Sequence, residues 1–252
     1  MVEKREMRTV LDYLKRFFFV RKCVSCKTIL AYEEANQAFC PSCNLRWSAS
    51  KSETCGECFK SAVECICMPK KLSKSGALCL RKLVFYNKNK QNEAQSRIIY
   101  FLKRNKNRRA AEFIARELSG AIKKEAEILE ISDIPEQMII TWVPRTRKAK
   151  SEYGFDQSEL VCRAIEKLLG IPCAPLILRK LGGREQKKLN RNERIKNAQN
   201  RFMINSKIAI PEGKTVLLFD DVVTTGASMS ECVSLLRKKG IKSVICLTIA
   251  KN

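Results

Sequence analysis

The chain has 252 residues, 45% of them hydrophobic, which is enough for one medium-sized globular domain and a smaller one. It carries 49 lysines and arginines against 26 aspartates and glutamates, and this net charge of +23 favours a polyanion as partner, although a merely basic surface is the alternative. It has no histidine, which excludes imidazole as a metal ligand or general base.

The first predicted element is an amphipathic helix over residues 3–20. Its apolar residues recur at spacings of three and four among basic ones, namely Val10, Leu11, Leu14, Phe17 and Phe18. We expect this helix to pack against the body, and a membrane surface is the alternative because the stretch is basic and ends in phenylalanines. The apolar runs are too short for a membrane span or a secretory signal, so we expect a cytoplasmic protein.

Nine of the thirteen cysteines lie before Leu80, and eight of these form close pairs: Cys23 and Cys26, Cys40 and Cys43, Cys55 and Cys58, Cys65 and Cys67. A Cys-x-x-Cys turn directs two thiolates at one ion, and two such turns complete a tetrahedral shell. The spacing therefore predicts two structural zinc ions, paired in chain order or in an interleaved arrangement. Disulfides are disfavoured because no secretory signal is present, and an iron–sulfur cluster because no Cys-x-x-Cys-x-x-Cys run occurs.

Residues 69–76 are polar and rich in helix breakers, so we place a domain boundary there. The predicted organisation is an N-terminal amphipathic helix over 1–22, a double zinc ribbon over 23–76, and a larger domain over 77–252.

The larger domain alternates predicted strands with predicted helices. The strands cover residues 80–86, 137–143, 172–178, 204–210, 214–219 and 243–249. The helices cover residues 93–102, 110–129, 157–169 and 229–239. This alternation predicts an α/β fold with a mostly parallel sheet covered on both faces, whose ligands bind at the carboxyl ends of the strands.

The most informative stretch runs from Val216 to Ser228, where an apolar strand leads into two carboxylates, a hydroxyl-rich turn and a helix. The carboxylates can accept hydrogen bonds from ribose hydroxyls, and the free N–H groups at the helix start can bind a phosphate. The predicted binding residues are Asp220, Asp221, Val222, Val223, Thr224, Thr225, Gly226, Ala227 and Ser228. A nucleotide hydrolase is disfavoured because the chain has no Gly-x-x-x-x-Gly-Lys-Ser/Thr loop.

Two basic segments accompany this stretch. Residues 145–150 directly follow a predicted strand, so their cations should face the same edge of the sheet as the two carboxylates. Residues 184–201 are predicted to form a mobile lid or solvated arm, and a plain charged helix face is the alternative. The arm supplies the candidate contacts to single-stranded DNA: Arg184, Lys187, Lys188, Arg191 and Arg194. A third basic cluster, over 103–109, has no assigned place.

The stretch from Val216 to Ser228 resembles the phosphoribosyl pyrophosphate (PRPP) motif of type I phosphoribosyltransferases. Four segments in order resemble the ComF family, also called GntX-like, across nearly the whole chain. They are Val143-Pro144, then Tyr153 to Gln157, then the arm residues Gln186, Leu189, Arg194, Asn197 and Phe202, and finally Asp220 to Ser228 of that motif; the family also shows paired cysteines. The chain departs from the family pattern with Tyr153 in place of an arginine, Asp156 in place of an asparagine, and a shortened last cysteine pair.

The resemblance implies a type I phosphoribosyltransferase fold behind a double zinc ribbon, in proteins linked to natural competence and the handling of incoming single-stranded DNA. It implies binding of PRPP or a related ribose phosphate with magnesium, and competence-machinery proteins as partners. For catalysis it would place Asp220 and Asp221 on the ribose and Arg145 and Arg147 beside the leaving pyrophosphate. The alternative is an active phosphoribosyltransferase of nucleotide metabolism with no role in DNA handling.

Overall fold

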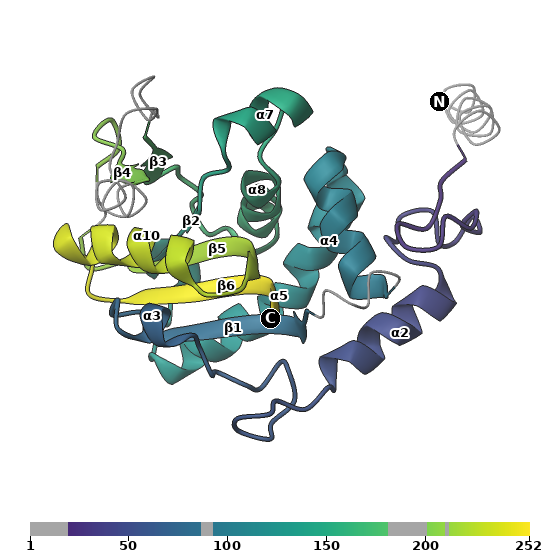
Figure 1. Cartoon of the computed structure of the whole chain (residues 1–252), viewed down its shortest axis with the longest axis horizontal. Coiled ribbons are helices and arrows are strands. Elements are labelled where there is room, and N and C mark those ends of the chain that lie inside the picture. The colour runs from purple at the N-terminus through teal and green to yellow at the C-terminus, as the bar shows by residue number, and fades with distance from the viewer. Residues whose placement is uncertain (1–19, 87–92, 181–200, 210–211) are drawn as a thin grey trace, which may run out of the picture.

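The computed structural model describes residues 20–86, 93–180, 201–209 and 212–252 (Figure 1). In these residues a four-stranded parallel sheet has the order β1-β6-β5-β2, and a separate antiparallel pair is formed by β3 and β4. The strands are β1 (Cys79–Phe85), β2 (Met138–Trp142), β3 (Ile177–Arg179), β4 (Phe202–Ile204), β5 (Thr215–Val223) and β6 (Val244–Lys251). The predicted α/β class with a mostly parallel sheet is confirmed.

Helices cover both faces of the sheet, and each face has its own apolar core. One core includes α4 (Ala94–Arg104), α5 (Arg108–Ile128) and α8 (Gln157–Leu169). The other includes α10 (Ala227–Lys238) and the short α3 (Lys70–Ser73). Burial on both faces explains why most residues of the strands are apolar, and all eight residues of β6 are buried.

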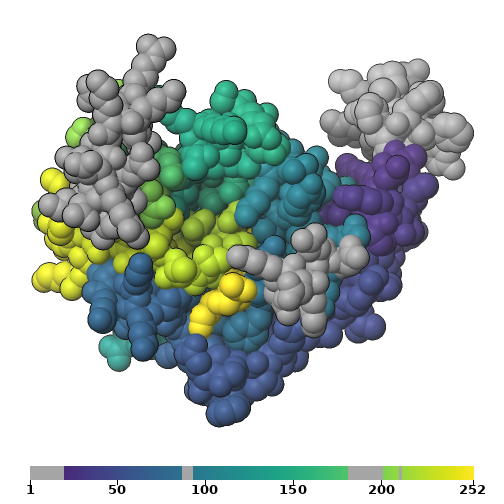
Figure 2. Space-filling model, viewed as in Figure 1, coloured from purple at the N-terminus to yellow at the C-terminus, as the bar shows by residue number. Residues whose placement is uncertain are grey.

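The cysteine-rich part packs directly against the larger domain. Trp47 of α2 (Pro41–Lys51) lies edge-on against Phe113 of α5, with ring centroids 5.5 Å apart. Its Nε1 donates to Glu117 Oε2 at 2.8 Å, and Lys51 Nζ forms an ion pair with the same oxygen at 2.8 Å. In Figure 2, the first described residues of the chain, coloured purple, lie beside α4 on the surface of the molecule. The two parts share a core, and the proposed domain limits remain predictions.

The structure corrects three predicted strands. The strand predicted over 204–210 is observed as β4, which ends at Ile204 and pairs with β3 outside the main sheet. The strand predicted over 172–178 is split into an isolated bridge at Cys173 and the short β3. The strand predicted over 214–219 continues to Val223, because its pairing with β6 extends that far. The two carboxylates therefore lie within a strand, not in a loop.

Four described helices were not predicted from the sequence: α2, α7 and the one-turn helices α3 and α6. Helix α2 begins at Pro41, directly after the third cysteine of the first cluster. Helix α7 (Arg147–Tyr153) occupies most of the segment expected as a basic loop; Thr146 caps its start, and Gly154 ends it with φ of 74°. Helix α6 covers Ile134–Gln137. The predicted helix over 3–20 lies almost wholly outside the described residues. No helix in the described ranges is both long enough and apolar enough to cross a membrane.

One ion pair inside the fold is buried. Arg81 of β1 and Glu125 of α5 are hydrogen-bonded, and their side chains are 6% and 5% exposed. We expect Glu125→Gln to lower the free energy of unfolding by about 3–5 kcal/mol, measured by urea denaturation, because it leaves the guanidinium buried without a counter-charge. The double variant Arg81→Met/Glu125→Leu should recover most of that loss, since it removes both charges. A loss below about 1 kcal/mol in the single variant would contradict this assignment.

Candidate functional site

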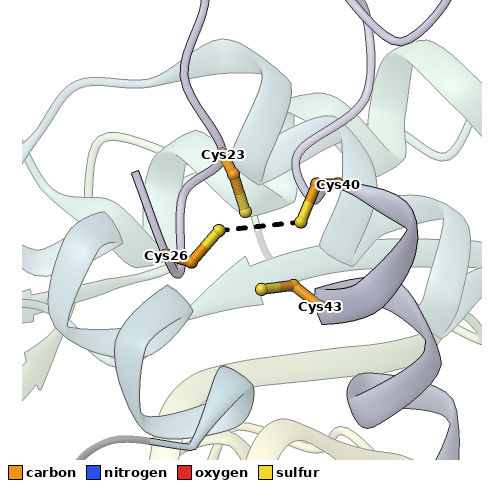
Figure 3. A group of neighbouring side chains, drawn as sticks. All are labelled: Cys23, Cys26, Cys40 and Cys43. Carbon is orange, nitrogen blue, oxygen red and sulfur yellow. Dashed lines mark hydrogen bonds between the residues drawn. The ribbon is translucent and has the colours of Figure 1, made fainter. Parts of the chain in front are cut away.

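The first four paired cysteines converge on one point (Figure 3). The sulfurs of Cys23, Cys26, Cys40 and Cys43 all lie within 4.8 Å of one another, and those of Cys26 and Cys40 are 3.6 Å apart. Zinc–sulfur bonds of about 2.3 Å in a tetrahedron separate the sulfurs by about 3.8 Å. The cluster therefore has the donor type and spacing of a structural zinc site.

The second cluster repeats the geometry of the first. Its sulfurs also lie within 4.8 Å of one another and belong to Cys55, Cys58, Cys65 and Cys67. In each cluster the residue after the second cysteine is left-handed, with φ of 67° at Lys27 and 59° at Phe59. The N–H of each donates to the carbonyl of the first cysteine, at 3.1 and 3.0 Å. The pairing follows chain order, so the interleaved alternative is excluded.

Several groups hydrogen-bond to the cysteine sulfurs. The Thr28 hydroxyl lies 3.2 Å from Cys26 Sγ, and this hydrogen bond lowers the pKa of Cys26 to about 6. Arg46 Nη2 donates to Cys43 Sγ at 3.5 Å. Cysteine binds zinc as the thiolate, and a hydrogen bond donated to the sulfur stabilises that charged form.

The two carboxylates of β5 have different surroundings. Neighbouring strand residues point to opposite faces of a sheet. Asp220 Oδ1 accepts from the N–H of Asp221 at 3.0 Å, and burial, reinforced by the charge of Asp221, raises the pKa of Asp220 well above its usual value. Asp221 Oδ2 accepts from Gln157 Nε2 at 2.8 Å and lies 3.4 Å from Lys103 Nζ.

The turn after these carboxylates leads straight into α10. Thr224 and Thr225 are exposed, and Gly226 precedes the helix with φ of 69°. A Cβ at Gly226 would lie 3.3 Å from side-chain carbons of Pro69 and Leu72, so both the positive φ and the close approach favour glycine. Within the described part of the chain, no side chain caps the start of α10. Its first N–H groups can therefore donate to an anion.

Arg145 contacts several segments at the same edge. Its guanidinium donates to the carbonyl of Lys103 at 2.8 Å and to that of Phe155 at 3.4 Å. It also lies 4.6 Å from the ring centre of Tyr153, the residue that replaces the family's arginine. Arg147 is exposed at the start of α7. The observed contacts of Arg145 are structural, and the catalytic roles of both arginines remain predictions.

The second departure from the family pattern, Asp156, caps α8. Its Oδ1 accepts from the N–H of Ser158 at 3.0 Å, and its Oδ2 from the N–H of Arg145 at 2.9 Å. Burial raises the pKa of Asp156. The two contacts use both carboxylate oxygens as acceptors, whereas an asparagine has one acceptor oxygen and could make only one of them.

Sequence reasoning gave no site role to Lys103 or Gln157, although the structure brings both to Asp221. Lys103 lies at the end of α4 and Gln157 at the start of α8; in the sequence, Lys103 belongs to the basic cluster over 103–109 and Gln157 to the segment that resembles the ComF pattern. The candidate DNA contacts lie outside the described residues: Arg184, Lys187, Lys188, Arg191 and Arg194.

Residues 151–252 match the model of the family described as "Phosphoribosyl transferase domain". This part of the chain is therefore similar to phosphoribosyl transferase domains. The chain also overlaps weakly with a solved structure titled as the allosteric regulatory enzyme of purine biosynthesis, with a TM-score of 0.32 and 19% identity over 51% of this chain and 25% of that one. That overlap is too low to support an argument.

The chain is also homologous to curated competence proteins, which confirms the ComF resemblance. It is 25% identical to "Competence protein ComFC" of Streptococcus pneumoniae over 241 residues, which cover 91% of this chain and 100% of that protein. It is 32% identical to "Competence protein F" of Haemophilus influenzae over 36% of this chain and 40% of that protein. It is 28% identical to "DNA utilization protein YhgH" of Escherichia coli K12 over 44% and 49%. Apart from the pneumococcal protein, the matches span about half of each relative or less.

The cysteine clusters lead to the first prediction about the site. Protein purified without added metal should contain about two zinc ions per chain by elemental analysis. Cys40→Ser should lose one of them and unfold the first ribbon, because binding of a structural metal contributes directly to folding. Cys79→Ser is the matched control, because that cysteine lies outside both clusters and should leave the metal content unchanged. Metal-free, folded protein with eight titratable thiols in these clusters would refute the prediction.

Proposed function

We propose that the chain binds PRPP or a related ribose phosphate, together with magnesium, at the carboxyl end of β5. The observation that carries this proposal is the placement of two carboxylates directly before the uncapped start of α10. Asp220 and Asp221 would accept from the ribose hydroxyls, and residues 224–228 would donate backbone N–H groups to the 5-phosphate. Magnesium commonly binds through one or two carboxylates and the substrate phosphates, a donor set that these aspartates fit.

The same site could carry out transfer. The bond from the ribose C1 carbon to pyrophosphate breaks, an acceptor bonds to C1, and positive charge develops on the sugar in between. Catalysis then needs mainly positioning and neutralisation of the leaving group, which suits a chain without histidine. The other candidate is a platform that binds PRPP without turning it over, since a fold does not determine activity.

We further propose a role in handling single-stranded DNA. The named relatives are competence and DNA utilization proteins, and the net charge of +23 suits a polyanion. On α4, Tyr100 is 57% exposed and the Arg104 guanidinium lies 4.3 Å from its ring centre. Exposed aromatic rings among cations are typical of surfaces that bind single strands. An active enzyme of nucleotide metabolism would bind PRPP without this DNA affinity.

The ligand proposal predicts a thermal shift. PRPP with magnesium should raise the melting temperature, and at a concentration 100 times the dissociation constant it should add about 2.7 kcal/mol to the free energy of unfolding. Asp220→Asn/Asp221→Asn should abolish this shift, because the amides lose the negative charge offered to hydroxyls and magnesium. Glu136→Gln/Glu212→Gln makes the same change in charge at exposed positions and should respond like the parent. An unaltered shift in the aspartate variant would show that the ligand binds elsewhere.

The DNA proposal predicts a strong dependence on salt. The logarithm of the affinity for an oligothymidine should fall with the logarithm of salt concentration, by about 0.7 for each phosphate neutralised. Replacing Lys187, Lys188, Arg191 and Arg194 with alanine should reduce this slope by up to about 3. The control replaces four exposed lysines elsewhere: Lys123, Lys124, Lys167 and Lys239. Equal slopes in the two variants would remove the 184–201 segment from the DNA hypothesis.

A further inference from the structure

The end of α4 brings a cation to Asp221. In Figure 1, α4 stands beyond the carboxyl ends of β5 and β6. The Lys103 carbonyl accepts from Arg145 Nη2 at 2.8 Å, so the backbone at this point is tied to the segment that follows β2. The Lys103 side chain is 41% exposed, and its Nζ lies 3.4 Å from Asp221 Oδ2. A long, partly exposed ion pair contributes little to stability, so this ammonium can exchange partners at small cost.

Asp221 has a second, better-buried donor. Gln157 is only 7% exposed, and its Nε2 donates to Asp221 Oδ2 at 2.8 Å. Its Oε1 is buried and has no hydrogen-bond partner among the described residues. Buried polar atoms are nearly always paired, so the orphaned oxygen shows that the contact with Asp221 dictates how this amide is oriented. Gln157 can therefore hold the carboxylate when Lys103 leaves it.

The two sides of β5 would meet different parts of a ligand. Asp220 lies on the side of α10, where its charge acts on Cys232 of that helix. Asp221 contacts α4 and α8 on the other side. A 5-phosphate bound at the start of α10 would leave the opposite end of PRPP, its pyrophosphate, toward Lys103.

We propose that Lys103 binds the pyrophosphate group of PRPP by exchanging it for Asp221, while Gln157 keeps the Asp221 carboxylate in position. This inference rests on the proposed ligand site. A pyrophosphate carries more charge than a carboxylate and offers several oxygens, so the exchange is favourable for an ammonium with three donors. Lys103 is then a ligand-binding residue and Gln157 a positioning residue.

The test compares two ligands that differ at C1. Calorimetric titration with PRPP and magnesium, and separately with ribose 5-phosphate, gives both affinities for each variant. Lys103→Met should weaken PRPP binding about 10- to 100-fold and leave ribose 5-phosphate binding within about twofold. Lys103→Arg should retain most of the PRPP affinity, because it keeps the charge. Lys106→Met, at a nearby exposed lysine, should leave both affinities unchanged.

Gln157→Met tests the second half of the proposal. Without the amide, Lys103 remains the partner of Asp221, so the affinity for PRPP should fall while that for ribose 5-phosphate, which needs no exchange, stays within about twofold, with circular dichroism confirming the fold. Equal losses for both ligands in Lys103→Met, or no loss for either, would overturn the exchange while leaving the ligand site intact. A wild-type chain that binds neither ligand would overturn the proposed function and the exchange with it.

Discussion

The pairing of β5 on both of its edges is the constraint on which the rest of the molecule depends. β2 pairs with its first half, and β6 pairs with it as far as Val223. Because the strand keeps its alternation through Asp220 and Asp221, these carboxylates are directed to opposite faces of the sheet. Each face then supplies its own groups: α10 and its uncapped start on one side, and the ends of α4 and α8 on the other. The register of β5 thus determines which groups surround each carboxylate. The turn after β5 borders the proposed site on one side only.

The second cysteine cluster is joined to the same edge of the sheet. Lys82 of β1 is buried and donates through Nζ to the carbonyl of Cys65 at 2.6 Å, while Lys251 of β6 forms an ion pair with Glu57 at 3.2 Å. The segment that follows the cluster then packs Pro69 and Leu72 against Gly226 at the start of α10. A metal that orders this ribbon therefore also supports the turn where a phosphate would bind, since metal binding and folding share one free energy. The ribbon is part of the framework of the site.

The sequence was sufficient for features that depend on local periodicity and spacing. The alternation of predicted strands and helices predicted the parallel sheet, and the cysteine spacing predicted two four-thiolate clusters, which the sulfur positions bear out. It was insufficient where tertiary pairing overrides a local signal. The predicted strand ended at Phe219, directly before the acidic pair, yet pairing with β6 keeps the strand extended to Val223. Lys103 had no assigned role because its contact with Asp221 joins residues more than a hundred positions apart, which no local pattern encodes.

The site also extends beyond the part of the chain that matches the phosphoribosyl transferase domain. That match begins at residue 151, whereas Lys103 and Arg145 precede it and meet at this edge through a hydrogen bond between the Arg145 guanidinium and the Lys103 carbonyl. Tyr153 removes a positive charge relative to the family pattern, but its ring lies against the Arg145 guanidinium and so helps to fix a cation that is already present. The loss of charge at one position therefore does not leave the edge without cations. At this edge a cation comes from the end of α4, where the family pattern has one in the segment that enters α8. Because α4 packs against the first cysteine cluster, the proposed site is linked to that cluster.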